Sequence, residues 1–233
     1  VKFEVSEQAA EQTIRILKNC KDSKLILEYL KWVLIKTPKI AMRVFSVLDE
    51  KVVHPDKMIE YLEQNISNPA NARMLKEKFL EVQVLDNKIE DEKYHTILAK
   101  YYVQQLFEMR PRDYKDEQYD KKFQGDKKME SLMKKFHDFL RDPKAKYRSD
   151  TILQEIKDSW LFDDEIYLYG KEKQHQKALK KLLENHHFIY AEEYCSSKNE
   201  GLLTELFKLY IRLYLDTEAE MKNKPSKECD QIL

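Results

Sequence analysis

The amino-acid sequence predicts an all-α protein, built as an α-solenoid of stacked antiparallel helix pairs. Only 3 glycines and 6 prolines occur among 233 residues, whereas sheet proteins need many glycines in their turns. Signals for helix starts recur about every 11–17 residues through most of the chain, so two successive helices give a helix-pair period in the range of repeat proteins. Short connections between such helices force neighbours to run antiparallel. A compact helical bundle is the main alternative fold.

Proline after a capping residue marks several helix starts, because proline has no N–H and its preset φ suits the first helical position. Such pairs are Thr37-Pro38, His54-Pro55 and Asn68-Pro69, which begin helices at about 38–48, 55–65 and 69–85. Ser6 and Ser23 can cap the first two helices, and Asp91 can cap a longer one. The other expected helices follow Gly125 as far as Asp142-Pro143, and lie at about 150–159, 163–170, 174–184, 188–196 and 201–215.

Two segments break this pattern. The stretch 110–124 is dense in charge and opens with Pro111, so we expect a mobile loop between helices. The residues after Asp216 are polar and contain Pro225, so we expect them to fray. The predicted organisation is therefore a solenoid over 1–215, with about eleven or twelve helices, followed by a polar tail at 216–233.

Composition excludes several functional classes. Lys plus Arg and Asp plus Glu both number 42, so the overall charge does not indicate binding to nucleic acid or to an anionic membrane. No apolar run approaches the ~20 residues of a transmembrane helix, and no signal peptide is visible. Because the chain starts at Val1, we expect it to be a piece of a longer protein. Its widely separated cysteines, Cys20, Cys195 and Cys229, indicate a reduced intracellular compartment.

The sequence lacks the motifs of common enzymes, so we expect a binding protein without catalytic residues, metal or cofactor. There is no H-E-x-x-H, nucleophile elbow, Walker loop or Cys-x-x-Cys. His186 and His187 are adjacent, and adjacent helix positions do not share a face, so they do not predict a zinc site. Cys195 lies about two helical turns from His187 and is interpreted as a small buried residue.

Two charged clusters have alternative interpretations. Asp163 to Glu165 lie at a predicted helix start, where the helix dipole favours negative charge, so metal binding is not needed to explain them. The second cluster shares one helix face and consists of Lys127, Lys128, Lys134 and Lys135. These lysines could form a weak contact for an anionic lipid or an acidic partner. Acidic residues lie among them, so a solvated face is the preferred interpretation.

Three stretches together resemble a known family. They are EYLKWVLIKTPKIAMRVF at 28–45, NKIEDEKYHTILAKYY at 87–102, and EIYLYGKEKQHQKAL at 165–179, which continues into YAEEYC at 190–195. They look like the helical region of the family that joins the vacuolar sorting protein 39 and the transforming-growth-factor-β-receptor-associated protein. The second stretch favours the latter, endosomal branch. The resemblance spans roughly residues 10–215, except for the charged segment at 110–124.

The resemblance implies an amino-terminal β-propeller followed by a long α-solenoid, with helix pairs like those of clathrin-heavy-chain and tetratricopeptide repeats. This chain resembles a central to carboxy-terminal piece of that solenoid. The packing residues of the third stretch are Gly170, Ala178, Leu179, Ala191 and Cys195. We expect Gly170 to end a helix in the left-handed conformation, and the small residues to let neighbouring helices approach closely.

For function, the resemblance implies a subunit of a multisubunit tethering complex of the CORVET or HOPS type, which captures vesicles before SNARE-mediated fusion. The expected partners are other core subunits, with Rab GTPases contacted mainly through parts of the protein outside this chain. No nucleic-acid partner is expected. The expected location is cytoplasmic and peripheral, on early endosomes or on vacuolar or lysosomal membranes.

Other roles stay open at this point. A self-assembling, clathrin-like coat protein would have similar helix pairs, and relatives of this family in animals are linked to receptor and Smad signalling as adaptors. An enzyme of an unrecognised helical class ranks last, because it would need a pocket with convergent carboxylates or histidines. No motif in the sequence identifies the partner-binding surface.

Overall fold

The fold is known from a computed structural model that describes residues 7–36, 43–46, 48, 51–111, 126–198 and 201–223. Every regular element among these residues is helical, which confirms the all-α prediction for this part of the chain. The elements are α1 (Glu7–Asn19), α2 (Ser23–Lys36), α4 (Pro55–Asn65), α5 (Pro69–Glu81), the π-helical turn η1 (Val82–Asp86), α6 (Glu92–Met109), α8 (Lys127–Arg141), α9 (Ser149–Ile156), α10 (Phe162–Lys171), α11 (His175–Glu184), α12 (Phe188–Lys198) and α13 (Gly201–Asn223).

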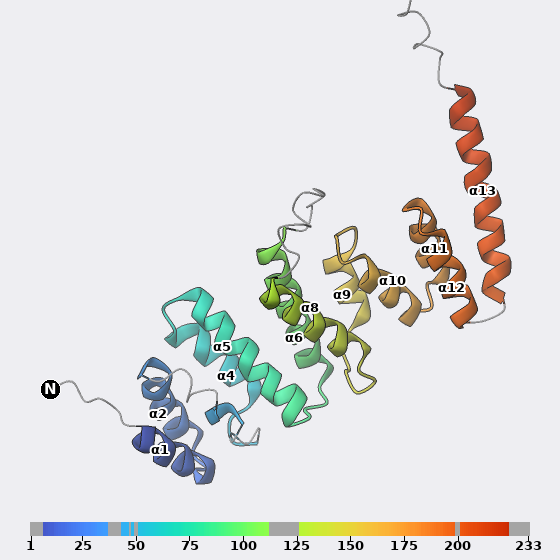
Figure 1. Cartoon of the computed structure of the whole chain (residues 1–233). Helices are drawn as coiled ribbons and strands as arrows, with labels where there is room; N and C mark the ends of the chain where they lie inside the picture. The colour runs from blue at the N-terminus through green and yellow to red at the C-terminus, as the bar shows by residue number, and fades with distance from the viewer. Residues whose placement is uncertain are drawn as a thin grey trace, which may run out of the picture. The chain divides into compact units, whose positions relative to one another are not determined.

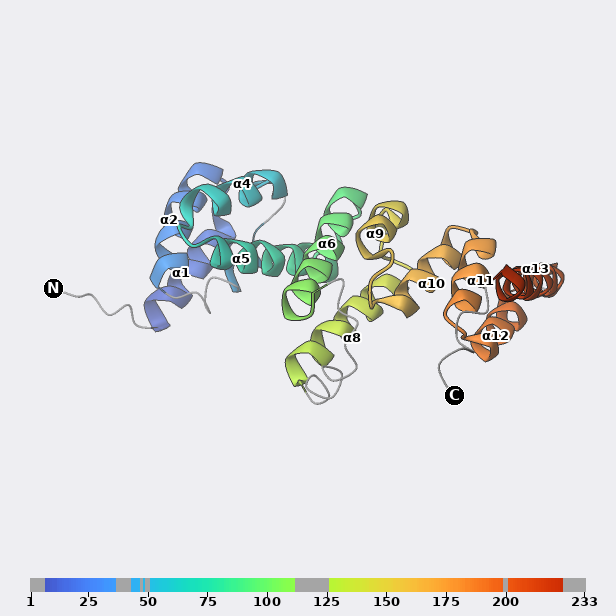
Figure 2. The same cartoon turned by 90° about the horizontal axis from the view of Figure 1, so that it is seen from above.

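The chain forms two compact units, which are described separately. Unit 1 comprises 1–109 and 126–148, and unit 2 comprises 110–125 and 149–233. The predicted extent of the solenoid, 1–215, stays a prediction. Within each unit, successive helices pack against one another, as stacked helix pairs do. Figures 1 and 2 show α6 beside α8 in unit 1 and α11 beside α12 in unit 2.

Two of the predicted proline starts are confirmed by their capping hydrogen bonds. The His54 ring accepts from the backbone N–H of Asp56 at 3.4 Å, and Pro55 opens α4. The Asn68 side chain accepts from the N–H of Ala70 at 2.9 Å, and Pro69 opens α5. These bonds satisfy first-turn N–H groups that have no partner within the helix. The third pair, with most of the helix expected at 38–48, lies outside the described residues.

The cap of α2 differs from the prediction. Asp22, rather than Ser23, caps this helix, because its Oδ1 accepts from the N–H groups of Lys24 and Leu25 at 2.9 and 3.3 Å. Ser23 is instead the first helical residue. The expected cap of α6 is confirmed, since Asp91 Oδ1 accepts from the N–H of Lys93 at 2.8 Å.

Three helix ends also differ from the expected ones. The helix predicted over 69–85 becomes α5 and the wider turn η1, where the buried Gln83 amide donates to the Phe45 carbonyl at 3.1 Å. Helix α9 stops at Ile156 because Asp158 adopts a left-handed φ of 57°. Helix α13 continues past 215 to Asn223, because 216–223 contain good helix formers and neither glycine nor proline.

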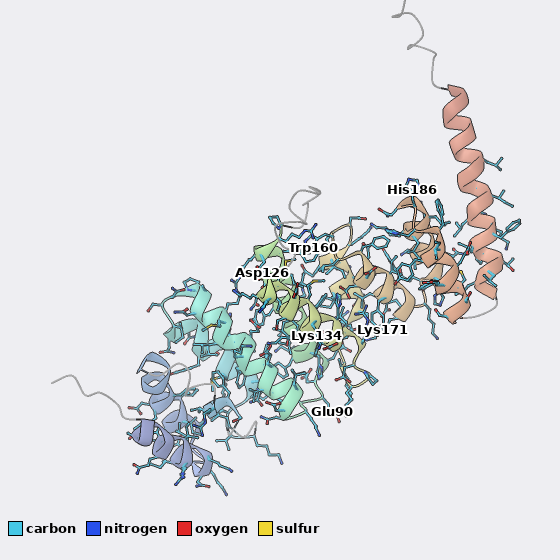
Figure 3. All side chains as sticks on the ribbon, in the orientation of Figure 1. Glu90, Asp126, Lys134, Trp160, Lys171 and His186 are labelled. Carbon is cyan, nitrogen blue, oxygen red and sulfur yellow. The ribbon has the colours of Figure 1, made fainter. Side chains whose placement is uncertain are left out.

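Each unit has its own core. In unit 1, Phe45 packs edge-to-face on Phe79 with ring centroids 5.3 Å apart, and Tyr102 packs in the same way on Phe139 at 6.0 Å. In unit 2, the core between successive helices consists mainly of small and branched residues, including Ile156, Leu168, Ala178, Leu182 and Ala191. Trp160, labelled in Figure 3, donates its indole N–H to the Arg110 carbonyl at 3.1 Å within this unit.

Candidate partner-docking groove

A groove with a volume of about 820 Å³ runs between α5, α6 and α8 of unit 1. Regular helical spacing produces it, because residues three or four apart share a face. On α5 the lining repeats at Arg73 and Glu77, and on α8 it repeats at Lys128 and Leu132. The complete lining is Ala70, Arg73, Met74, Glu77, Lys78, Gln105, Glu108, Met109, Lys127, Lys128, Ser131, Leu132 and Lys135.

Helix α8 owes its position to one buried stripe and a strong cap. The stripe repeats at helical spacing and consists of Met129, Leu132, Phe136, Phe139 and Leu140, all buried. Asp126 caps the helix by accepting from the N–H groups of Lys128 and Met129 at 2.9 and 3.3 Å. Figure 3 labels Asp126 at this end of α8 and Lys134 further along it. The cap therefore fixes the turn that carries the first groove lysines.

The groove is predominantly cationic. Five of its lining residues are Lys or Arg, and only Glu77 and Glu108 are acidic. Arg73 forms a bidentate pair with Glu108, with one N–O distance of 2.7 Å. A planar guanidinium matches a carboxylate in this way, so the pair holds α5 against α6 while neutralising Glu108.

Two further cations meet on a carboxylate just beyond the groove. Lys78 and Lys135 both pair with Glu81, the latter at 3.0 Å. Tyr102 also donates its hydroxyl to Glu81, at 3.0 Å. Burial alone would raise the pKa of Glu81, but the hydrogen bonds from both lysines outweigh burial and lower the pKa. Burial and the nearby Glu81 charge raise the pKa of the Tyr102 hydroxyl.

Glu77 lies one helical turn before Glu81 and is in the opposite electrostatic situation. It is 3% exposed and accepts a hydrogen bond from the Gln105 amide of α6. Burial raises its pKa above the ordinary value, although Lys78 opposes this shift. The groove wall thus contains Glu77, whose neutral form is favoured by burial. Just outside the groove, Glu81 is held ionised by Lys78 and Lys135.

The remaining groove lysines have no such partners. Lys127 and Lys128 are exposed, and neither side chain forms an ion pair with any residue that the structure describes. The groove also contains apolar surface from Met74, Met109 and Leu132. Met74 is 44% exposed, and methionine side chains adapt readily to irregular partners. The site therefore combines two free positive charges with an adaptable apolar lining.

The sequence had singled out four lysines of this helix. All four are exposed, and Lys127, Lys128 and Lys135 line the groove, whereas Lys134 does not. Sequence reasoning missed Arg73 and Lys78, because they come from α5, far earlier in the chain. Periodicity predicts which residues share a face of one helix, but it does not predict which face of a distant helix lies opposite.

The packing residues expected from the third of the stretches that resemble the family are all in unit 2. Ala178, Leu179, Ala191 and Cys195 are buried on α11 and α12. Burial raises the pKa of the Cys195 thiol, and its Sγ lies 3.6 Å from the Leu202 carbonyl oxygen. A thiol of this kind has little thiolate character, so the geometry gives no support to a nucleophilic cysteine.

Gly170 has a different role from the expected one. It does not end α10 in the left-handed conformation; that position belongs to Lys173, with φ 56°. The N–H of Gln174 donates to the Tyr169 carbonyl at 2.8 Å and that of Lys173 to Gly170, which closes a Schellman motif. Position 170 requires a residue without a side chain because Tyr194 packs closely against it. A Cβ at this position would lie 2.9 Å from the Tyr194 hydroxyl.

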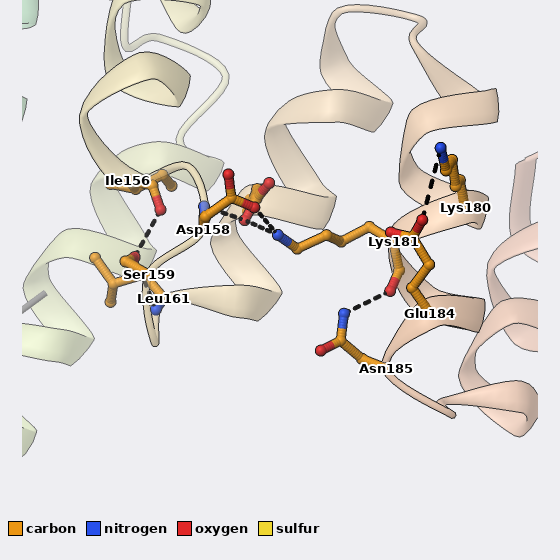
Figure 4. A network of polar contacts seen from close by, with 9 residues as sticks. Ile156, Asp158, Ser159, Leu161, Lys180, Lys181, Glu184 and Asn185 are labelled. Atoms are coloured by element: carbon orange, nitrogen blue, oxygen red, sulfur yellow. Dashed lines mark hydrogen bonds and ion pairs between the residues drawn. The ribbon is translucent and has the colours of Figure 1, made fainter. Parts of the chain in front are cut away.

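Glu165, the last residue of the acidic cluster at the start of α10, is part of a buried polar network, whereas Asp163 is exposed. Glu165 is 0% exposed, and its Oε2 accepts from the N–H of Asp158 at 3.0 Å and lies 3.4 Å from Lys181 Nζ. Figure 4 shows Lys181 extending from α11 to Asp158, with which it also pairs. This network ties the α9–α10 connection to α11. Lys181 is thus the cationic partner of Glu165.

The histidines after α11 also have structural partners. His186 occupies the left-handed position of a second Schellman motif, with φ 61°. The His187 ring packs against Phe162, with ring centroids 4.9 Å apart. Across the described residues, no group of three or more His, Cys, Asp or Glu side chains is arranged to hold a metal ion. Nor is any described helix both long and apolar enough to cross a bilayer.

Comparison with known proteins agrees with the predicted resemblance to the receptor-associated branch. The chain is similar to transforming growth factor-beta receptor-associated protein 1. It is 28% identical to the homologue from Danio rerio over 220 residues, which are 90% of this chain and 24% of that protein. With the Homo sapiens protein it is 28% identical over 215 residues, or 88% of this chain and 23% of the relative. The chain thus spans about a quarter of the length of the curated relatives that it matches.

The Mus musculus protein of the same name is 27% identical over 217 residues. No family model matches the chain, and no solved structure matches it. The likeness therefore rests on whole-chain sequence similarity to these proteins. It extends across both units, since it covers about nine-tenths of the chain.

Proposed function

We propose that this chain is a partner-docking scaffold segment of a vesicle-tethering subunit of the CORVET type, acting in endosomal membrane fusion and transport to the vacuole or lysosome. The observation that carries the proposal is the similarity over 90% of the chain to a transforming growth factor-beta receptor-associated protein. Stacked helix pairs support it, because they offer a long surface for several partners and are poorly suited to a closed catalytic pocket.

In this proposal the chain binds other core subunits of the complex and lies peripherally on endosomal or vacuolar membranes. Rab GTPases would be contacted mainly through other parts of a longer protein. The segment itself performs no catalysis. The buried thiol of Cys195, with its raised pKa, and the lysine-paired carboxylates are consistent with a packing role for these groups. A receptor or Smad adaptor remains the nearest alternative, since the matched relatives are named for association with a receptor.

A direct binding experiment tests the proposal. The purified 233-residue chain is immobilised and offered individual tethering-complex core subunits, active Rab proteins and receptor cytoplasmic domains, each as a purified protein. Capture of a core subunit without Rab supports the docking scaffold. Capture of receptor domains alone favours the adaptor, and capture of none of these proteins contradicts both roles.

One observation favours a second candidate, a self-assembling coat-type protein. Apolar side chains recur every fourth residue along α13 and are exposed, with Phe207 at 64%; the others are Leu203, Ile211 and Leu215. An exposed apolar stripe on a helix is a surface through which copies of a chain can associate. Sedimentation of the purified chain over a range of concentrations separates the candidates, because a coat-type protein assembles without any partner.

A further inference from the structure

We infer that the groove between α5, α6 and α8 binds an acidic amphipathic helix of a partner protein. This inference rests on the proposed function, because it specifies the chemistry of a docking partner. Three features of the groove carry it: its unpaired cations, its exposed apolar lining and its concave form.

Some of the cations in the groove are paired with carboxylates and others are not. Arg73 is paired with Glu108, and Lys78 and Lys135 are paired with Glu81, so these three cations already have carboxylate partners. Lys127 and Lys128 have none among the described residues, and both lie in the first turn of α8. An incoming carboxylate therefore gains its strongest attraction at this end of the groove. Such complementarity raises the association rate and selects against basic partners.

The apolar lining determines the second property of the partner. Met74 and Met109 line the groove beside the lysines, and Met74 is exposed although methionine normally contributes to cores. A flexible thioether surface is suited to the apolar face of a helix, whose anchors recur three or four residues apart. A partner helix with carboxylates beside such anchors would satisfy the cations and cover the methionines together.

The groove shape favours a protein segment over a membrane. Its lining comes from three helices around a volume of about 820 Å³, and a flat bilayer surface reaches the rim of such a groove but not its apolar lining. A single acidic helix can enter the groove, place its carboxylates near Lys127 and Lys128, and cover the exposed Met74 with its apolar face.

Selection from a peptide library tests the inference without knowledge of the natural partner. A phage library of randomised helical peptides is panned against the intact 233-residue chain without counter-selection, and the Lys127→Glu/Lys128→Glu protein serves afterwards as the groove variant. The matched control is Lys57→Glu/Lys134→Glu, which makes the same charge change at exposed lysines outside the groove. The affinity of each selected peptide is then measured for all three proteins by fluorescence anisotropy.

We expect the enriched peptides to carry several carboxylates and apolar residues spaced by three or four. Their affinity should fall at least tenfold for the Lys127→Glu/Lys128→Glu protein, should change less than twofold for the control, and should weaken as salt is added. The groove variant is expected to fold, because it places carboxylates in the first turn of α8, where the helix dipole favours them. Circular dichroism and a thermal melt verify this.

Two outcomes would overturn the inference. One is enrichment of neutral or basic peptides, or of peptides that bind all three proteins equally. The other is loss of binding to phosphatidylserine vesicles in the groove variant without any selected peptide, which would assign the lysines to a membrane. If peptide selection fails while a tethering subunit is still captured, the proposed function stands and the docking surface lies elsewhere. If peptides bind but no subunit is captured, the groove inference stands and the tethering role fails.

Discussion

The two units of this chain both bury carboxylates, but in very different surroundings. In unit 2, Glu165 is fully enclosed and its charge meets Lys181, which also pairs with Asp158. In unit 1, Glu77 is almost as buried, yet it lies in the wall of an open groove with free lysines at one end. The first arrangement joins neighbouring elements. The second leaves charge and apolar surface accessible to a partner.

This difference shows that a buried charge does not by itself indicate a functional site. The two regions differ in whether a groove with unpaired charged side chains lies beside the buried carboxylate. Around Glu165, the Lys181 side chain and the backbone amide of Asp158 both contact one carboxylate oxygen, Oε2, in an enclosed site. In the groove that Glu77 lines, Lys127 and Lys128 have no partner in the described part of the chain. We therefore expect substitutions in unit 2 to alter stability, and substitutions at the groove to alter binding.

The largest expected effect is at Lys181. Replacing it with methionine leaves Glu165 buried without its cation, which destabilises a protein by about 3–5 kcal/mol. Urea unfolding monitored by circular dichroism measures this loss. The control is Lys180→Met on the same helix, whose exposed pair with Glu184 contributes about 0.5 kcal/mol or less. Equal losses for the two variants would show that the enclosed network is not structural.

The next effect concerns the close approach of α12 to α10. Gly170→Val should destabilise the protein by about 1–3 kcal/mol, because the new side chain displaces the buried Tyr194 ring. The Tyr194 hydroxyl would also move from the His175 ring nitrogen, now 2.7 Å away. Gly201→Val is the matched control, since a Cβ there meets nothing within 4 Å. Thermal melts should separate the two valine variants; coincident melts would contradict the packing argument.

A smaller, stabilising effect is expected at the two residues with left-handed φ that follow helices of unit 2. Lys173→Gly and His186→Gly should each stabilise the protein by about 0.5–1 kcal/mol, because glycine adopts a left-handed φ without the steric strain that a side chain causes. This value already allows for the greater conformational entropy that glycine loses on folding. The contrasting variant is Lys177→Gly inside α11, which should cost about 1 kcal/mol. Denaturant midpoints for the three proteins provide the measurement. Destabilisation at 173 and 186 would contradict the assigned motifs.

The smallest effects are expected for the replacement of Glu77 or Glu81 by glutamine, which should change the stability of the protein with opposite dependence on pH. The raised pKa of Glu77 favours its neutral form in the folded state, so this stabilisation is lost as pH rises through the folded-state pKa. Glu77→Gln should then stabilise the protein at pH 7, by about 1 kcal/mol or less, and should lose this advantage toward pH 4. Urea titrations at both pH values measure the change.

For Glu81 the sign is reversed. Its lowered pKa contributes stability above the unfolded-state value, and that contribution is lost as pH falls through the folded-state pKa. Glu81→Gln should therefore destabilise the protein at pH 7, and the difference from wild type should shrink in acid. If both glutamine variants responded to pH in the same direction, the two carboxylates would not differ as described.

The fold was largely predictable because helix starts depend on short-range chemistry. Asn68-Pro69 predicts a capped start from two adjacent residues, and Asp91 was predicted as the cap of α6 in the same way. The choice of Asp22 over Ser23 was not predictable, since both residues can cap and a one-residue shift decides between them. Gly170 was misassigned because glycine suits both a left-handed end and a close approach. Tyr194, the residue that decides the matter, lies on another helix.

The groove was not predictable for a related reason. Its free lysines were identified on one helix face, but Arg73, Met74 and Glu108 come from two other helices. Which faces meet depends on packing angles and on the turn η1, neither of which periodicity specifies. The acidic cluster was correctly attributed to the start of α10, while the burial of Glu165 against Lys181 depends on the positions of α10 and α11.

In the proposed function, this chain is a docking scaffold whose partner occupies the groove of unit 1. Hydrogen–deuterium exchange of the chain, alone and bound to the tethering-complex core subunit that it captures, shows which helices the partner covers. We expect slower exchange in α5 and α8 on binding, and no such slowing with the Lys127→Glu/Lys128→Glu protein. Slowing confined to α12 and α13, unaffected by the groove variant, would show that the partner binds outside the groove.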